Sequence, residues 1–495
     1  MKISLPRLIE TVEPTQLVEA YSRLSPSEYV GRLAPSLGMV IEHELFNPRV
    51  IVSSEFLYAD AFLSITHLDP IMDVLKIVND GLRVVREAPI AVSLTQEMGF
   101  GKTHFLTLLW HLYAKTYDWD ISSLKTTGVD LDKLASTGYT RRIAERTLVF
   151  TIDLLRLPQG LKPYEAIFET SAKILEKKIR VHGIATVEPS FIRSLGMFRP
   201  LEAANSLVAK LSELRKSIPI LVLVDELHGG VSGIAEGASS ERIRSLTNVI
   251  LFLKDLIEAS RGRVPLVFIY ASARQDVDRW SKTSEILPKI CPDEESRIAV
   301  SLLVEAVDEL NDRIMRLKPG MLKPLKVEDV VSILALRLLR FKARKSDILP
   351  AIHKALRERF EEFLGEEGIE FLEKKLMDFY PFSPSYEFLI FKFIHPTFGA
   401  DLPKSQHIRD LLKVTASVIS RLEKERWGEC SLIGIAHVKP EDFAYSMDER
   451  LAGEWIRIYR ACEMVSQKIA DKDIRELMQA MLSICLLYTS PSPRD

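Results

Sequence analysis

The chain has 495 residues, more than one ordinary hydrophobic core can serve, so two or three domains are expected. Apolar residues make up 47% and charged residues 27%, a balance typical of globular proteins, which argues against disorder. The formal net charge of −2 excludes a global field that would draw the whole chain onto nucleic acid or an anionic membrane.

The cysteines and the apolar runs favour a cytoplasmic protein. Cys291, Cys430, Cys462 and Cys485 show no CxxC or other metal-like spacing, which fits a reducing compartment. The first residues carry a charge or a proline every few positions, so no apolar leader is visible. No apolar run approaches the roughly 20 residues that a membrane helix needs, so no membrane partner is expected.

In chain order, the first half of the sequence predicts an α/β domain. Residues 1–85 indicate a helical lead-in, in which a helix begins at Asp69-Pro70. Short apolar runs that predict buried strands lie at 89–94, 147–152, 219–224 and 265–270. Helical segments lie between them at 164–182, 201–216 and 241–260. This alternation indicates a parallel sheet sandwiched by helices over residues 86–325.

After about Pro324 the strand signals stop, and a helical lid domain is expected over 326–484. Its predicted helices cover 326–345, 350–377, 384–395, 405–424 and 451–484. The last eleven residues, 485–495, share none of this pattern, and their string CLLYTSPSPRD resembles the translation of a transposase-type sequencing adapter. The alternative is a genuine Ser/Pro tail. We treat this segment as an adapter artefact and leave it out of fold reasoning.

A glycine-containing loop between the strand at 89–94 and the next helix predicts a phosphate-binding site. Small residues there let backbone N–H groups point at phosphate oxygens, and the dipole of the following helix helps. Lys102 is expected to reach the β- and γ-phosphates of ATP, and the Thr103 hydroxyl to ligate Mg²⁺. A glycine turn beside a chance lysine would give the same letters, and Gln96 replaces the first glycine of the strict pattern. The candidate nucleotide-binding residues of this loop are Gln96, Gly99, Phe100, Gly101, Lys102, Thr103 and His104.

An acidic pair ends the buried strand that begins near Ile218. Asp225 and Glu226 follow Lys102 by 123 and 124 residues, a reasonable distance for a second strand of the same sheet. In a P-loop ATPase the aspartate at this place holds the Mg²⁺ shell, and the glutamate beside it polarises the attacking water. Asp225 is therefore the predicted metal residue and Glu226 the predicted catalytic residue, although a strand can also end in two solvated acids.

The next strand ends near Ser272, a polar residue placed to sense the γ-phosphate or simply to begin a loop. Arginines that could stabilise charge on that phosphate are Arg242, Arg244, Arg274 and Arg409. The basic run at 337–345 has one aromatic residue, so it fits a solvated helix face better than a nucleic-acid site.

Several of these segments, in order between about 55 and 425, resemble the large AAA-type ATPases of domain-of-unknown-function family 499. The loop at 94–104 is similar to that family's loop, in which glutamine often replaces the first glycine and histidine follows the threonine. The strand end at 222–226 matches its acidic strand. Further likeness lies at 62–75, at 336–341, at 380–384, where Ser383 replaces a histidine, and at 406–412.

The resemblance implies an AAA-like core and lid within a much longer full chain, in prokaryotic settings of phage defence and DNA processing. By analogy, Arg409 is the catalytic lid arginine that faces the γ-phosphate. The expected cofactors are ATP and Mg²⁺, and the expected activity is ATP hydrolysis that remodels DNA or a DNA-bound protein complex. A homo-oligomer would favour this motor, because a neighbouring subunit's arginine could complete the site. The alternatives are an ATP-gated switch with little turnover and a degenerate scaffold that binds nothing.

Overall fold

The computed structural model divides the chain into two compact units. It describes residues 6–23, 36–50, 52, 69–96, 101–116, 131–183, 187–214, 218–237, 239–321, 327–342, 345–394, 408–443, 449–469, 471, 474–475, 477–478, 481–482 and 485. One unit, Gly31–Pro324, is called the sheet unit below. The other unites Met1–Val30 with Leu325–Asp495 and is called the helical unit.

The sheet unit alternates strands with helices, as the sequence predicts. Its strands are β2 (Ile90–Gln96), β3 (Leu148–Asp153), β4 (Ile220–Asp225), β5 (Leu266–Ala273) and β6 (Gly320–Met321). Its helices are α4 (Leu37–Leu45), α6 (Asp69–Arg83), α7 (Lys102–Tyr113), α9 (Leu131–Ser136), α10 (Arg141–Arg146), α11 (Pro163–His182), α12 (Pro189–Leu195), α13 (Pro200–Ser212), α14 (Leu227–Gly237), α15 (Ser240–Ser260), α16 (Arg274–Ile286), η3 (Leu287–Lys289) and α17 (Glu294–Arg316).

These strands form a parallel sheet in the order β3-β4-β5-β2-β6. Strand β2 comes first in the chain among the strands of this sheet. It lies between β5 and β6 and not beside β3. Because all strands run the same way, their carboxyl ends meet at one edge of the sheet. The predicted α/β class with a parallel sheet is confirmed.

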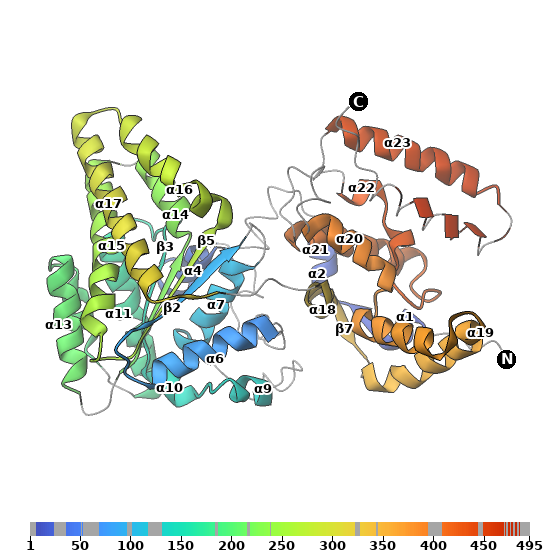
Figure 1. Ribbon diagram of the computed structural model, residues 1–495, viewed down its shortest axis with the longest axis horizontal. Coiled ribbons are helices and arrows are strands. Elements are labelled where there is room, and N and C mark those ends of the chain that lie inside the picture. Colours follow the sequence, from blue (N-terminus) through green and yellow to red (C-terminus); the bar gives the residue numbers. More distant parts are fainter. Residues whose placement is uncertain are drawn as a thin grey trace. The chain divides into compact units, whose positions relative to one another are not determined.

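Helices cover both faces of this sheet. Side chains alternate along each strand, so Val222 and Val224 of β4 pack into a core with α11, α13, α15 and α17, whereas Leu221 and Leu223 point to the opposite face. Helices α6 and α7 contact the strands on that opposite face (Figure 1). Strands buried on both sides need continuous apolar runs, which explains why these segments were visible in the sequence.

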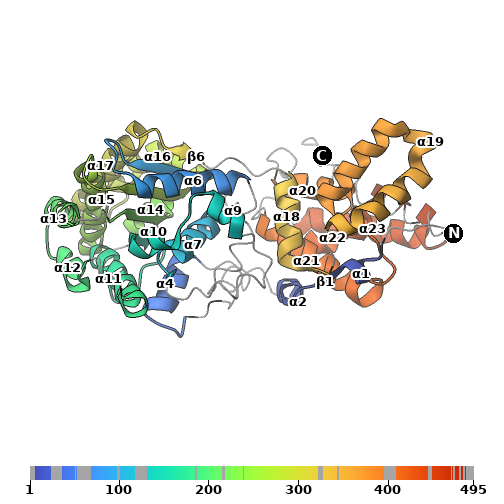
Figure 2. The same ribbon diagram turned by 90° about the horizontal axis from the view of Figure 1, so that it is seen from below.

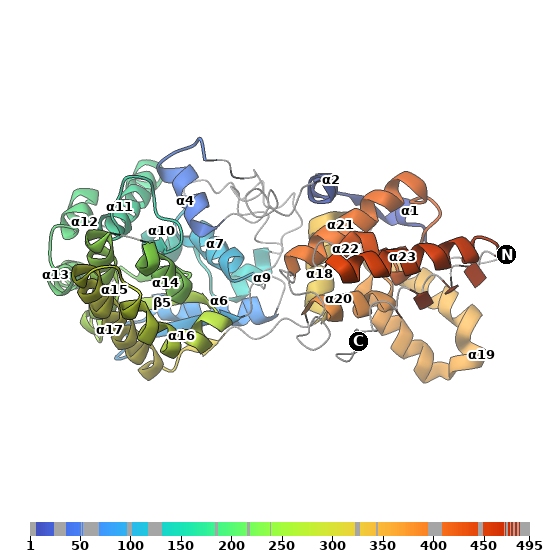
Figure 3. The same ribbon diagram turned by 90° about the horizontal axis from the view of Figure 1, so that it is seen from above.

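The helical unit contains two short strands besides its helices. Its elements are α1 (Leu8–Thr11), β1 (Val12–Pro14), α2 (Gln16–Arg23), α18 (Val327–Leu338), β7 (Leu339–Phe341), α19 (Lys345–Phe379), η4 (Pro384–Tyr386), α20 (Glu387–Ile394), α21 (Ile408–Glu425), η5 (Ile435–His437), α22 (Pro440–Phe443) and α23 (Glu449–Ser466). Figures 2 and 3 show this unit from two further sides. No described helix combines the length and the apolar character that a membrane span requires.

The lead-in expected over 1–85 is not one body, and this corrects the expected division of the chain. Strand β1 pairs antiparallel with β7, and α2 packs on α21, so the first described residues belong with the C-terminal helices. Helices α4 and α6 belong to the sheet unit instead. The pairing of β1 with β7 joins residues more than 300 positions apart. A three-residue strand has no apolar periodicity of its own, because its hydrogen bonds come from the distant partner strand.

The basic run at 337–345 is also not a simple helix face. Helix α18 ends at Leu338, and the next three residues form β7, which the sequence did not indicate. Arg340 lies 3.3 Å from the Glu13 carboxylate, and Lys342 lies 3.7 Å from it. The N-terminal segment therefore neutralises part of this positive charge. In the same unit, helix α23 ends at Ser466 and does not run through the whole segment predicted at 451–484.

Helix α6 approaches the sheet closely at Gly81, which generates a stability prediction. A Cβ atom at Gly81 would lie 2.5 Å from Val267 Cγ2 and 2.9 Å from Ile90 Cδ1. We expect Gly81→Ala to destabilise the chain by about 1–3 kcal/mol in urea unfolding, because the overlap outweighs the better helix propensity of alanine.

Gly233 provides the matched control, since it is also helical and its Cβ would meet a side-chain atom at 3.8 Å. Gly233→Ala should stabilise the chain by up to about 1 kcal/mol. Equal unfolding midpoints for the two variants would contradict the close packing of α6 on the sheet.

Candidate functional site

The chain turns sharply between β2 and α7 at the carboxyl edge of the sheet. Gly101 is the N-cap of α7 and has φ +83°, a left-handed conformation that glycine adopts without strain. A Cβ atom there would meet no described atom within 4 Å, so backbone conformation and not crowding calls for glycine. Gln96 ends β2. Gly99 and Phe100 lie outside the described residues.

The first turn of α7 meets the end of β4. Lys102 and Thr103 begin the helix, and the Thr103 hydroxyl donates to Asp225 Oδ1 at 3.3 Å. The same oxygen accepts the Glu226 backbone N–H at 3.1 Å. Strand β5 separates β2 from β4, so α7 must cross below β5 to make this contact, and it touches all three strands. The tertiary structure thus brings together the lysine, threonine and aspartate singled out in the sequence.

The Asp225 carboxyl sits in an environment that opposes its charge. Burial, then the nearby Asp153 and Glu226 carboxylates, raise the pKa of Asp225 well above its usual range, although the Thr103 hydrogen bond and Lys102 act in the other direction. Among the described residues, Asp225 Oδ2 is buried and accepts no hydrogen bond. A carboxylate with an unpaired buried oxygen is a place where a cation would be stabilised.

Asp153 is a residue of this site that sequence reasoning missed. It ends β3 in register with Asp225 on β4, so the two side chains lie on the same face of the sheet. Its carboxylate accepts backbone N–H groups of Gly38 at 2.9 Å, Leu155 at 3.0 Å and Arg156 at 3.2 Å. Asp153 therefore ties α4 and its own following loop to the sheet, while its charge acts on Asp225. An acidic residue just after a predicted strand was the available signal.

Glu226 begins the turn from β4 into α14 in a left-handed conformation, with φ +53°. Such a conformation costs a non-glycine residue about 1 kcal/mol or more and often marks a functional site. The Gly230 N–H donates to the Glu226 carbonyl at 2.7 Å and closes the turn. The Asp276 and Glu226 carboxylates both lie close to Gly229. A Cβ atom at this position would be 2.7 Å from Asp276 Oδ2 and 3.6 Å from Glu226 Oε2, so glycine leaves space for them.

Ser272 lies on the other face of the sheet from Asp225 by strand alternation. Its side chain is fully buried, and its hydroxyl lies 2.9 Å from His228 Nδ1 in α14. The Asn311 amide of α17 donates to His228 Nε2 at 3.2 Å. Burial lowers the pKa of His228 to about 4, so the ring is neutral and its Nδ1–H donates to Ser272. Ser272 on β5 thus holds His228, two residues after Glu226, through hydrogen bonds on the opposite face of the sheet from Asp225.

The candidate arginines are scattered. Arg274 is exposed and starts α16 directly after β5, at the carboxyl edge of the sheet. Arg242 is exposed on α15, and Arg244 lies 3.1 Å from the Glu295 carboxylate. Arg409 lies in the first turn of α21, in the helical unit. His104, also named from the sequence, is half-buried in the first turn of α7.

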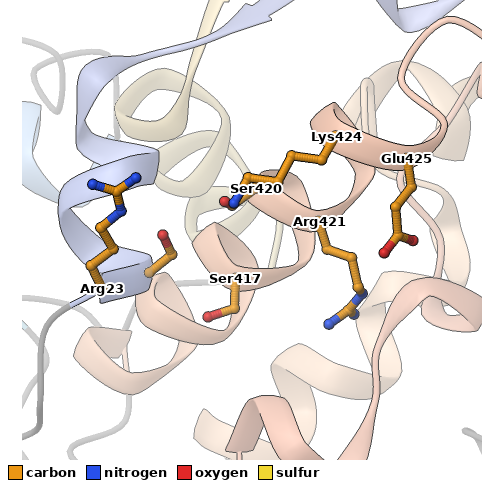
Figure 4. Close-up of a pocket in the computed structure, with 7 residues that line it drawn as sticks. Arg23, Ser417, Ser420, Arg421, Lys424 and Glu425 are labelled. Atoms are coloured by element: carbon orange, nitrogen blue, oxygen red, sulfur yellow. The ribbon is translucent and has the colours of Figure 1, made fainter.

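The helical unit has a separate hollow of about 330 Å³ between α2 and α21, near Arg23, Arg421 and Lys424 (Figure 4). It is a weak site for an anion, because α2 and α21 both end there and helix C-termini carry partial negative charge. Arg421 is already engaged in a two-pronged pair with Asp442, at 2.8 and 2.9 Å. The carboxyl edge of the sheet is therefore the candidate functional site.

Within the described residues, no group of three or more histidine, cysteine, aspartate or glutamate side chains could hold a metal ion by itself. Mg²⁺ does not need such a cage, since it is commonly bound by one or two protein oxygens together with phosphates and water. The Thr103 hydroxyl and the unpaired Asp225 oxygen fit that pattern.

Comparison with known proteins brought no match: no family model, no curated protein and no solved structure matches the chain. The resemblance to family 499 therefore stays a prediction from the sequence motifs.

The crowded carboxylates generate a stability prediction. We expect Asp225→Asn to raise the free energy of unfolding of the nucleotide-free, metal-free protein by about 1–3 kcal/mol at pH 7, because it removes a carboxyl group whose ionisation the buried surroundings oppose. The pKa of Asp225 is higher in the folded state than in the unfolded state, so the folded state keeps this proton up to a higher pH. Wild-type stability therefore falls as the pH rises from the unfolded-state pKa to the folded-state pKa. The gain from Asp225→Asn should therefore be larger at pH 7 than at pH 5.

Urea unfolding in EDTA measures this gain, with Asp312→Asn on the exposed face of α17 as the control expected to change nothing. A less stable Asp225→Asn protein at pH 7 would contradict the electrostatic description of the site.

Proposed function

We propose that the chain is a P-loop ATPase that binds Mg·ATP at the carboxyl edge of its sheet and hydrolyses it. The observation that carries this proposal is the 3.3 Å contact between Thr103 Oγ1 and Asp225 Oδ1. It joins the helix after the phosphate loop to the acidic strand end, which is where the two halves of a Mg·ATP site must meet. Their separation of 122 residues makes a chance pairing of two sequence motifs a poor explanation.

Each residue of the site has a chemical role in this proposal. Lys102 offsets negative charge on the β- and γ-phosphates, and the backbone N–H groups at the start of α7 add their dipole. Thr103 and Asp225 hold Mg²⁺, whose charge, when bound, offsets that developing on the phosphates. Glu226 accepts a proton from the attacking water, and the strained turn fixes where its carboxylate can reach.

The strand order supports a mononucleotide site over a dinucleotide site. In doubly wound dinucleotide folds, the strand before the glycine-rich loop lies next to the following strand of the chain. Here β2 lies between β5 and β6, and β5 separates it from the acidic strand β4. With this order, α7 passes β5 and reaches the end of β4, where Thr103 meets Asp225.

Coupling of hydrolysis to the remodelling of DNA or a DNA-bound protein complex is the expected use of this chemistry. Retention of Glu226 supports turnover, since a pure nucleotide-gated switch needs no residue to polarise water. The switch remains the second candidate, because a nucleotide-gated protein would use the same Lys102, Thr103 and Asp225 contacts without turnover.

Two substitutions separate binding from chemistry. We expect Lys102→Ala to abolish both binding of a fluorescent ATP analogue and Mg²⁺-dependent phosphate release. We expect Glu226→Gln to keep nucleotide binding but lose about 10²–10⁴-fold in turnover, the usual contribution of a general base. Arg409→Ala should lower turnover with little effect on binding. Each protein is assayed with and without single-stranded and duplex DNA, which shows whether DNA stimulates the reaction.

Lys289→Ala and Glu285→Gln serve as matched controls, since both side chains are exposed on α16 and η3. Wild-type binding without turnover above that of Glu226→Gln would replace the ATPase by the switch. Equal nucleotide affinity of wild type and Lys102→Ala would remove the phosphate-loop assignment.

A further inference from the structure

Helix α19 forms a hairpin whose bend leaves a large apolar surface uncovered. Gly365, with φ +65° and ψ −179°, interrupts the helix and separates two arms. Figures 2 and 3 draw the two arms meeting at a bend on the outside of the helical unit. The residues on either side of the bend, 357–371, are called the hairpin tip below.

The two arms of α19 pack against each other through buried side chains. Ile352 and Leu356 of the first arm belong to one buried cluster with Ile369 and Leu376 of the second. His353 Nδ1 lies 2.6 Å from Glu373 Oε2 across the arms. These contacts hold the hairpin together, while other apolar side chains of the tip are exposed.

The tip carries an apolar stripe at helical spacing. Phe360, Phe363 and Leu364 share one face of the first arm, and Phe371 follows on the second. Phe363 is 83% exposed and Phe371 65% exposed, although phenylalanine side chains at this spacing normally pack against a core. Several exposed aromatic side chains within one short segment are typical of interaction sites.

Acidic side chains surround that stripe. The tip contains exposed glutamates at 358, 361, 362, 366, 367 and 370. Arg357 holds two of them, with its guanidinium 3.4 Å from Glu361 Oε1 and 3.2 Å from Glu366 Oε1, and so bridges the bend. This pairing orders the tip before any partner arrives, which lowers the entropic cost of association.

The charge decides which class of partner fits. A surface rich in carboxylates repels nucleic-acid phosphates and anionic lipid headgroups. Apolar centres with charged rims are typical of protein interfaces, where a partner supplies the opposite charge. We infer that the hairpin tip of α19 is a docking surface for a protein partner that presents an apolar patch ringed by lysine and arginine. This inference concerns the helical unit and holds whether or not the chain hydrolyses ATP.

A designed probe tests the surface directly. We measure fluorescence anisotropy of a labelled amphipathic helical peptide with leucine and tryptophan on one face and lysine on the other, in the absence of nucleotide. Wild type should bind this peptide. Phe363→Ser with Phe371→Ser, and Glu362→Lys with Glu367→Lys, should each weaken binding by about tenfold or more, because aromatic anchors and charge complementarity act together.

Control variants lie in the sheet unit. Met197→Ser removes another exposed apolar side chain, and Glu202→Lys reverses another exposed acid; neither should change peptide binding. All the substituted side chains are exposed, so thermal melts should match wild type, and the comparison does not depend on refolding.

Four results would overturn the inference. The first is equal peptide affinity of wild type and both tip variants. The second is equal binding of a lysine peptide without an apolar face, which would reduce the tip to a charge effect. The third is binding of labelled duplex DNA by wild type that both tip variants lose. The fourth is a wild type that does not bind the peptide but self-associates in sedimentation, together with tip variants that do not self-associate. The tip would then bind a second copy of the chain.

Discussion

The buried carboxyl of Asp225 is the constraint on which the arrangement of the site depends. It ends a strand covered on both faces, beside a second carboxyl on the next strand, and a hydroxyl from α7 donates to one of its oxygens. Folding places this acid where its charge is disfavoured, which a sequence built only for stability would avoid. A cation bound beside Asp225 would relieve that cost, because it would offset the buried negative charge.

The elements around Asp225 supply rigidity from both sides of the sheet. On one face, Asp153 ties α4 to the end of β3 through backbone N–H groups. On the other, Ser272, His228 and Asn311 link β5, α14 and α17 in a buried chain of hydrogen bonds. Both sets of contacts lie beside the Glu226 turn, so packed structure on both faces of the sheet holds this turn in place.

The helical unit is built on a different principle. Its first strand and helix come from the N-terminus and pack against segments more than 300 residues later in the chain. The chain therefore leaves this unit and returns to it, with the sheet unit inserted between. The hairpin of α19 carries exposed aromatic and acidic side chains at its bend.

The sequence by itself determined the parallel sheet, because strands buried on both faces must be continuously apolar, and β2, β3, β4 and β5 appear as such runs. It also singled out Lys102, Thr103 and Asp225, since a glycine turn between a strand and a helix and an acidic strand end are both local patterns. The sequence could not give the order of the strands. Strand β5 lies between β2 and β4, and only the path of α7 past β5 brings the residues after β2 to the end of β4.

Other features were decided by the tertiary structure alone. Strand alternation turns the Ser272 hydroxyl toward His228. Asp153 entered the site through register with Asp225, and β1 formed only because β7 was there to pair with it. In each case the deciding contact joins residues far apart in the chain, and local patterns carry information about burial and turns but none about which distant partner provides them.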